Sequence, residues 1–462
     1  MSTTRQLEIG LSSGRSGTGP ATWGQQAIWD TVRGLGPADA PRYNVSLAAP
    51  VDPGVPLAPV LDALGRLLEL HDSLHTRLTQ DDDGRLRQTV DGAGRLTVQV
   101  RQCAGDEEAA AAGRQQLAEL AGQAFDVARE WPLRVGLVES GGLVRHLAFV
   151  LSHTAADAWG LRRLATDLTA IVLGDTPQAL GERFPALQPL DEAAFQAGDR
   201  GRRRDAAARQ HWRRKLALGP ERLFPAPAAP APGAAAKPFP NAVLNSPALA
   251  RALPMVAAGH RVSPSSVLLA AASAMTARLS GTPDALLQVV VNNRFLPGLA
   301  HAVSTVAAEG LFRLPDAGRE FTDVLRRTHA ASLATYRSAY YDKRLLDQDI
   351  AVLAERDGVV ADRSCFFNDT RDLMPAEPDA GAEPGAPAGP LDRERSRTTL
   401  SWPVEFAPRA NVSYALDAVQ APGALELSMT ADSAVLPRPD MERFLYGMEE
   451  LVIEAALAPG MG

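Results

Sequence analysis

The most informative segment of the sequence is Ser152-His153-Thr154-Ala155-Ala156-Asp157-Ala158-Trp159-Gly160. The run before it, Val144 to Ser152, is nearly all apolar from Leu147 to Leu151, which is typical of a strand buried on both faces at the centre of a sheet. Helical spacing from about Trp159 to Leu173 predicts a helix after it. A junction of this kind holds side chains on a rigid scaffold and presents them to a cleft.

His153 is the candidate for chemistry within this stretch. A histidine placed here can take a proton from a nucleophile, or orient the nucleophile's lone pair toward a thioester carbonyl. Asp157, four residues on, can hold the local turn, most simply by pairing with a cation. Taken alone, a single histidine at a strand end is more often a half-buried structural residue than a base, so the pattern by itself leaves both interpretations open.

The composition excludes several classes of protein. The 462 residues are 45% hydrophobic and 22% charged, which is ordinary for a globular protein with large cores. A net charge of -7 gives no broad attraction for nucleic acid or acidic membranes. Cys103 and Cys365 have neither metal-ligand spacing nor the pattern of a disulfide framework. No stretch reaches the roughly 18 apolar residues of a membrane span. We expect a cytoplasmic protein without a metal site.

Two mixed α/β lobes joined by a linker are predicted. Residues 1–19 are rich in Ser, Gly and Thr and lack an apolar core, so we expect a disordered tail rather than a signal peptide. Residues 20–190 form the first predicted lobe. Residues 191–240 comprise a basic helix from Glu192 to Leu216 and a Pro/Ala linker from Ala226. Residues 241–462 form the second lobe, in which Ser263-Pro264 starts a helix.

Five short motifs resemble those of nonribosomal peptide synthetase condensation domains, within the chloramphenicol-acetyltransferase-like superfamily. Ser152 to Ala158 resembles the family's HHxxxDG signature. The other four motifs occur in the family's order, so that the resemblance covers residues 20 to 460: Thr22 to Trp29 (TWGQQAIW), Tyr43-Asn44, His71 to Thr76 (HDSLHT) and Asn292-Asn293-Arg294, where the family carries an arginine.

The resemblance implies a fold and a role for each motif residue. The fold would be α/β, with two chloramphenicol-acetyltransferase-like lobes in a V-shaped pseudo-dimer and an active-site tunnel between them. His153 would be the catalytic or positioning histidine. Asp157 would be structural and paired with Arg294 across the cleft, tying the motif to the other lobe. The candidates for lining the tunnel are Trp159, Gly160, Asn292 and Asn293, although strand-end structure explains the two asparagines equally well.

Two residues depart from the family's signature. Ser152 replaces its first histidine, which is tolerable if that position serves packing or a hydrogen bond, because a serine can still form one. Ala158 replaces its glycine and so removes a residue free to adopt positive φ. Both are treated as structural residues near the site.

The resemblance implies a free-standing acyltransferase of natural-product or antibiotic biosynthesis, monomeric and without a bound cofactor. The sequence has no GxSxG, P-loop, GxGxxG or HExxH motif and no carrier serine of its own. The acyl donor would therefore arrive on the phosphopantetheine of a separate carrier protein, or on coenzyme A. The acceptor would be a small molecule or a second carrier-bound group, giving an amide or an ester. Cyclisation, or an inactive module that recruits a carrier or tailoring enzyme, are the alternatives.

Overall fold

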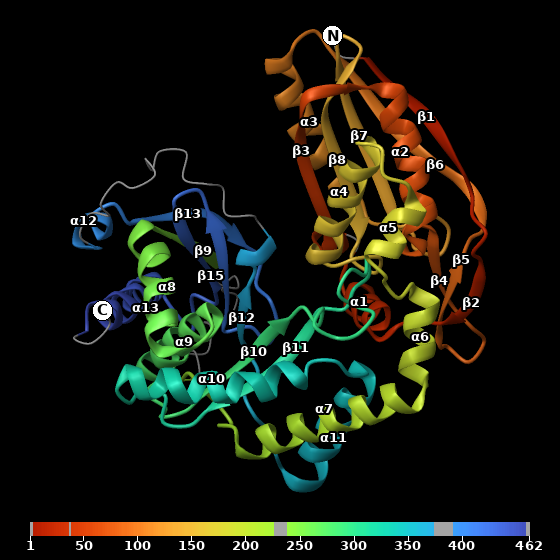
Figure 1. Ribbon diagram of the computed structural model, residues 1–462. Coiled ribbons are helices and arrows are strands. Elements are labelled where there is room, and N and C mark those ends of the chain that lie inside the picture. The colour runs from red at the N-terminus through yellow and green to blue at the C-terminus, as the bar shows by residue number, and fades with distance from the viewer. Residues whose placement is uncertain (1–2, 37, 226–237, 374–390, 459–462) are drawn as a thin grey trace, which may run out of the picture. The chain divides into compact units, whose positions relative to one another are not determined.

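The computed structural model describes residues 3–36, 38–225, 238–373 and 391–458 (Figure 1). Contacts between residues divide the chain into two units. The first comprises Met1–Asp205, Asn292–Ala307 and Asp342–Arg344, and the second comprises Ala206–Val291, Ala308–Tyr341 and Leu345–Gly462. The loop Asn292–Ala307 thus belongs to the first unit, although it lies within the sequence range predicted for the second lobe.

A five-stranded sheet forms the centre of the first unit. Its strands follow the order β1 (Thr3–Ser12), β6 (Ala93–Cys103), β7 (Leu133–Ser140), β8 (Leu143–Ser152) and β3 (Asn44–Pro56). Only the β6–β7 pair is parallel. Strand β8 lies between two neighbours and is buried without a break from Ala148 to Ser152, as its apolar run predicts.

Helices cover both faces of this sheet. The apolar stripe of α2 (Leu57–Leu70) and that of α4 (Ala158–Val172) share one core with Leu137 of β7. Successive side chains of a strand point to opposite faces, and the next residue, Val138, packs instead with Ala109 of α3 (Asp106–Ala121). The helix α3 therefore covers the opposite face, and the strand that carries the signature stretch is fixed from two sides.

The prediction of a disordered tail over residues 1–19 is wrong. Strand β1 pairs antiparallel with β6 along its whole length, and Ile9 and Leu11 are buried in the core. Strand β2 (Gly17–Pro20) pairs with β5 (Leu86–Val90), which also pairs with β4 (Thr76–Gln80). The alternation Leu7, Ile9, Leu11 is the period-2 pattern of a half-buried strand, which the Ser- and Gly-rich composition of the segment concealed.

The remaining helices of the first unit are short. They are α1 (Trp23–Arg33), α5 (Pro177–Arg183), α6 (Pro189–Ala197) and the single turns Ala40–Tyr43 and Asp72–His75. The helix predicted from Glu192 to Leu216 is two helices, α6 and α7 (Asp199–Leu218). Gly198, which separates them, has an extended backbone with ψ of 169°, so the intrahelical hydrogen bonds cannot continue through it.

A seven-stranded sheet forms the second unit. Its order is β11 (Ala308–Leu314), β10 (Ala285–Val291), β12 (Cys365–Asp369), β14 (Tyr414–Ala421), β15 (Ala424–Ala431), β9 (Phe239–Ser246) and β13 (Thr399–Phe406). The β10–β12 and β12–β14 pairs are parallel. Along β14, Tyr414, Leu416 and Ala418 are fully buried and alternate with half-exposed residues, so one face of the sheet carries the core.

Helices α8 (Pro247–His260), α9 (Pro264–Ser280) and α13 (Arg438–Leu457) pack on this face (Figure 1). The predicted helix start at Ser263 is confirmed, because its hydroxyl accepts a hydrogen bond from the Ser266 amide and Pro264 is the first helical residue. The unit also contains α10 (Phe321–Arg337), α11 (Lys343–Asp357), α12 (Leu391–Arg395) and the turn Arg371–Leu373.

Most of the predicted Pro/Ala linker, residues 226–237, lies outside the described residues, and the final part of that prediction falls on strand β9. Among the helices that the structure describes, none is both long enough and apolar enough to span a membrane.

Candidate functional site

The signature stretch forms a tight connection between β8 and α4. Strand β8 ends at Ser152, and Asp157 caps α4 by accepting a hydrogen bond from the Gly160 amide at 2.8 Å through Oδ1. Ala158 is the first residue of the helix and does not have a positive φ. The departure from glycine at position 158 therefore imposes no backbone strain, because an alanine is well suited to a helix.

Ser152 stabilises the same turn with its hydroxyl. Its Oγ lies 2.8 Å from the Thr154 hydroxyl and accepts a longer bond, of 3.4 Å, from the Thr154 amide. The Ser152 side chain is buried. The serine thus forms the hydrogen bond that was expected to make the departure from histidine tolerable.

Asp157 and Arg294 form the predicted ion pair. Arg294 Nη2 lies 2.8 Å from Asp157 Oδ1, and Nη1 lies 2.9 Å from Oδ2. The side chains are 2% and 11% exposed, respectively, so solvent screens the pair little. Both residues belong to the first unit. The expectation that Arg294 reaches Asp157 from the other lobe is therefore wrong, because the loop that carries Arg294 makes its contacts within the first unit.

The carboxylate of Asp157 also binds the far end of that loop. Its Oδ2 accepts hydrogen bonds from the Val306 and Ala307 amides at 3.1 and 3.0 Å. Arg294 Nη2 donates to the carbonyls of Ala302 and Ser304. One buried carboxylate thus closes the loop Asn292–Ala307 onto the signature stretch. Both oxygens of the Asp157 carboxylate are thus fully engaged in contacts within the fold.

His153 sits in the turn after β8, and its backbone is anchored by the same loop. The Thr305 hydroxyl donates to the His153 carbonyl oxygen. The ring is half-buried, and its Nδ1 is buried without a hydrogen-bond partner among the described residues. Among the residues that the structure describes, no carboxylate contacts the ring in the way that the acid of a catalytic triad contacts its histidine.

A pocket of about 170 Å³ opens beside His153. Three of the motifs from the sequence meet in it, since Trp29, Tyr43 and Asn44 line the pocket together with the signature stretch. The Asn44 amide donates to the carbonyls of Ala121 and Gln123 at 2.8 and 2.9 Å, which fixes one wall. A histidine beside a concave, mainly apolar space is suited to act on a bound nucleophile.

The four residues predicted to line a tunnel are not among those that line this pocket. Gly160 is buried, and a Cβ there would lie 3.3 Å from the Ser304 backbone. Asn293 is also buried and donates to the Val306 carbonyl at 2.8 Å. Asn292 accepts a hydrogen bond from the Arg294 amide. Both asparagines thus serve the geometry of the loop, while Trp159 is half-buried in the first turn of α4.

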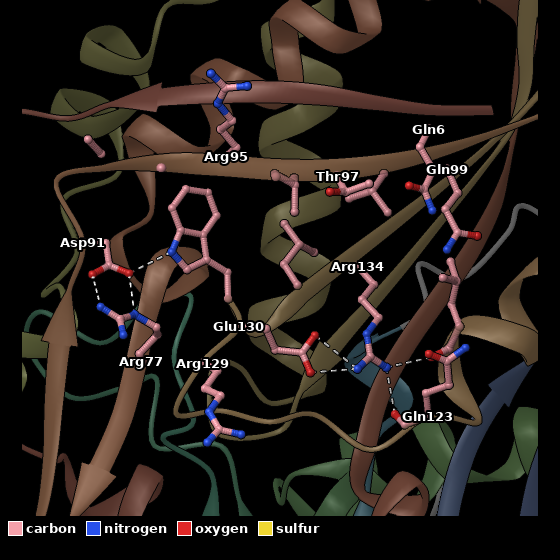
Figure 2. Close-up of a pocket in the computed structure, with 17 residues that line it drawn as sticks. Gln6, Arg77, Asp91, Arg95, Thr97, Gln99, Gln123, Arg129, Glu130 and Arg134 are labelled. Carbon is pink, nitrogen blue, oxygen red and sulfur yellow. Dashed lines mark hydrogen bonds and ion pairs between the residues drawn. The ribbon is translucent and has the colours of Figure 1, made fainter.

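A larger hollow, of about 650 Å³, is lined by β6, β7 and the segment before β7 (Figure 2). Its two acidic residues, Asp91 and Glu130, are each paired with an arginine of the lining. Arg77 binds both oxygens of Asp91 at 2.7 Å, and the Trp131 indole also donates to Asp91. Arg134 pairs with Glu130 at 3.0 Å. No predicted site residue lines this hollow. Its ion pairs connect neighbouring segments of the first unit.

Two contributors to the site were missed in the sequence. Thr305 carries no local signal, because its contact with His153 spans 152 positions. Gly24 lies inside a recognised motif, but its role depends on packing: a Cβ there would lie 1.7 Å from the Thr305 carbonyl oxygen. The backbone of α1 thus approaches the loop at the point where the loop holds His153, and only glycine permits that distance.

Comparison with curated proteins finds relatives among large peptide synthetases. The chain is 29% identical over 333 residues to the isonitrile lipopeptide synthase of Mycobacterium tuberculosis, a match that covers 69% of this chain and 13% of that protein. It is 27% identical over 339 residues to the phosphinothricin tripeptide synthetase of Streptomyces viridochromogenes, covering 71% and 31%. The chain therefore spans less than a third of either relative.

Solved structures with the same fold are condensation domains. A condensation domain that mediates chain release from the enacyloxin polyketide synthase matches with a TM-score of 0.68 at 22% identity, over 95% of this chain and 83% of that one. The first condensation domain of the calcium-dependent antibiotic synthetase matches with a TM-score of 0.66 at 15% identity, over 96% and 97%. The expected α/β fold of a condensation domain is thereby confirmed.

The family itself is recognised across almost the whole chain. The description that matches is condensation domain, over residues 37–461. This agrees with the resemblance drawn from the five motifs and with the nonribosomal peptide synthetases among the relatives. The chain belongs to the condensation domain family.

Proposed function

We propose that this condensation domain transfers an acyl group from a carrier-bound thioester to an amine or hydroxyl acceptor, forming an amide or an ester in natural-product biosynthesis. The observation that carries the proposal is the setting of His153. Its backbone is held by Thr305, and its ring lines the pocket where Trp29 and Tyr43 meet it. The family and its synthetase relatives support the same class of reaction.

In the proposed reaction, the nitrogen or oxygen of the acceptor attacks the thioester carbonyl. His153 accepts the proton that the nucleophile loses and returns it to the departing sulfur. A C–N or C–O bond forms, the C–S bond breaks, and the carrier is released as its thiol. The thioester is already activated, and no electrons are exchanged, so the step requires neither a metal ion nor a redox cofactor.

Asp157 and Arg294 support this reaction from a distance. Their ion pair and the two backbone amides bound to Asp157 fix the loop that carries Thr305. Thr305 in turn fixes the carbonyl of His153. A shift of about 1 Å at a reacting group can cost on the order of 100-fold in rate, so we assign both charged residues a positioning role.

The donor in this proposal is carried on the phosphopantetheine arm of an acyl- or peptidyl-carrier protein. The acceptor is a small molecule or a group on a second carrier. The test is to load candidate carriers with acyl groups, add a panel of amines and alcohols, and follow carrier and product by intact-protein and small-molecule mass spectrometry.

Wild type, His153→Ala and His260→Ala are compared in this assay. His260 ends α8 in the second unit, far from the signature stretch in sequence, and serves as the control. Loss of acyl group from the carrier with matching product, abolished in His153→Ala and retained in His260→Ala, supports the proposal. Equal turnover by His153→Ala and wild type would remove His153 from the mechanism. Stable carrier binding without turnover by any variant would favour the recruitment module.

A further inference from the structure

The pocket beside His153 has a specific chemical character. Its walls are mainly apolar, and the aromatic side chains among them are Trp29, Tyr43 and Phe125. Its volume of about 170 Å³ is close to that of an engineered apolar cavity of about 150 Å³ that binds benzene. A compact group of about the size of one six-membered ring therefore fits in it.

Arg33 is the one residue with a permanent charge among those that line the pocket. It lies in the last turn of α1, and its guanidinium carbon stands 4.9 Å from the centre of the Trp29 ring. No carboxylate forms an ion pair with it among residues 3–36, 38–225, 238–373 and 391–458, and its side chain is exposed to solvent at the mouth of the pocket. Stacking on an aromatic ring restrains a guanidinium while leaving its N–H groups able to donate.

Three other polar side chains of the pocket, those of Asn44, Ser152 and Thr154, are already engaged. The Asn44 amide donates to two backbone carbonyls, and the Ser152 hydroxyl is paired with that of Thr154. Arg33, His153 and the phenol of Tyr43 remain as the groups available to a ligand, and Arg33 is the one among them with a permanent charge. A planar guanidinium recognises carboxylates through paired hydrogen bonds. A ligand with a carboxylate next to its ring would therefore complement both Arg33 and the apolar space.

We propose that this pocket selects an acceptor that carries a compact aromatic group and a free carboxylate, with the ring between the aromatic walls and the carboxylate on Arg33. The inference rests on the proposed function, because His153 acts on the nucleophile and the nucleophile must therefore belong to the molecule seated in this pocket. A free aromatic amino acid is the simplest member of the class.

Binding without any donor tests the inference separately from turnover. NMR titrations of the full chain compare phenylalanine with phenylalaninamide, which lacks the carboxylate, and with alanine, which lacks the ring. A charge-assisted hydrogen bond and the burial of a ring are each expected to contribute roughly tenfold or more in affinity. Equal affinities for phenylalanine and its amide, or no binding of phenylalanine, would overturn the inference.

Variants of Arg33 identify the group responsible. Arg33→Gln is expected to reduce the preference for acid over amide to about one, and Arg33→Lys to restore part of it. Arg42→Gln is the matched control, because Arg42 is close in sequence, pairs with Asp39 and does not line the pocket. An unchanged preference in Arg33→Gln would refute the assignment. If the wild type prefers the acid over the amide but shows no turnover in the carrier assay, the proposed condensation is wrong, while the inference about the binding pocket is supported.

Discussion

Asp157 and Arg294, 137 positions apart in the sequence, form a two-point ion pair in which each carboxylate oxygen meets a different guanidinium nitrogen at 2.8 to 2.9 Å. The same carboxylate caps α4 and accepts two amide hydrogen bonds from the end of the loop Asn292–Ala307. The signature stretch and this loop are therefore held together by Asp157, and the loop in turn binds the backbone of His153 through Thr305.

Asp157→Ala is expected to destabilise the fold by about 3–5 kcal/mol, because it leaves a buried guanidinium without its partner. Urea unfolding measures the loss. Asp62→Ala is the control, since Asp62 forms an exposed pair with Arg66 on α2, and such pairs contribute about 0.5 kcal/mol or less. The double variant Asp157→Ala/Arg294→Met should lose less than the sum of the single variants; strict additivity would contradict the proposed coupling.

Gly24→Ala is expected to reduce both stability and turnover. The new methyl group would lie 1.7 Å from the Thr305 carbonyl oxygen, so either α1 or the loop must move, at a cost of about 1–3 kcal/mol. Thermal unfolding and the carrier assay measure the two effects. Gly36→Ala is the control, because nothing lies within 4 Å of its Cβ position. Similar behaviour of the two variants would show that the close approach does not position His153.

Ala158→Gly restores the residue that the family signature carries, yet we expect no gain in activity. Ala158 is the first residue of α4 and needs no positive φ, so glycine brings only its greater flexibility, with a loss of at most about 1 kcal/mol. Steady-state kinetics and urea unfolding of the variant check this. A marked rise in turnover would mean that the methyl group obstructs the substrate.

His75 is expected to make the protein sensitive to mild acid. Its side chain is fully buried, and burial lowers its pKa from 6.5, although Asp72 and Asp91 oppose that shift. The unfolded chain therefore binds a proton before the folded one. The free energy of unfolding should fall as the pH drops below 6.5, by up to about 1.4 kcal/mol per pH unit, until the pH reaches the lower folded pKa.

His75→Phe keeps a ring against Trp131, whose ring centre lies 5.9 Å from that of His75, and removes the titrating group. Its unfolding free energy should be less dependent on pH between 6.5 and 5 than that of the wild type, while the slopes agree near pH 8. Urea unfolding at several pH values measures both slopes. Identical slopes throughout would show that His75 does not cause the loss.

The local parts of the site could be predicted from the amino-acid sequence. The apolar run of β8 and a helix from about Trp159 follow from the hydrophobic pattern, which depends on neighbouring residues; α4 begins one residue earlier, at Ala158. The motif order identified Arg294 as the partner of Asp157, and the ion pair is present. The prediction of a disordered tail over residues 1–19 was wrong because it rested on composition. Strand β1 is stabilised by pairing with β6, which lies far along the chain.

The surroundings of His153 could not be predicted from the sequence and depend on the folded chain. The contacts of Thr305, Gly24 and Arg33 join segments that no periodicity or capping rule connects. The loop Asn292–Ala307 likewise joined the first unit through Asp157, against its place in the sequence. Packing and buried hydrogen bonds stabilise residues that are close in space, however far apart they are in the sequence. A linear sequence specifies such proximity through the whole fold rather than through any single stretch.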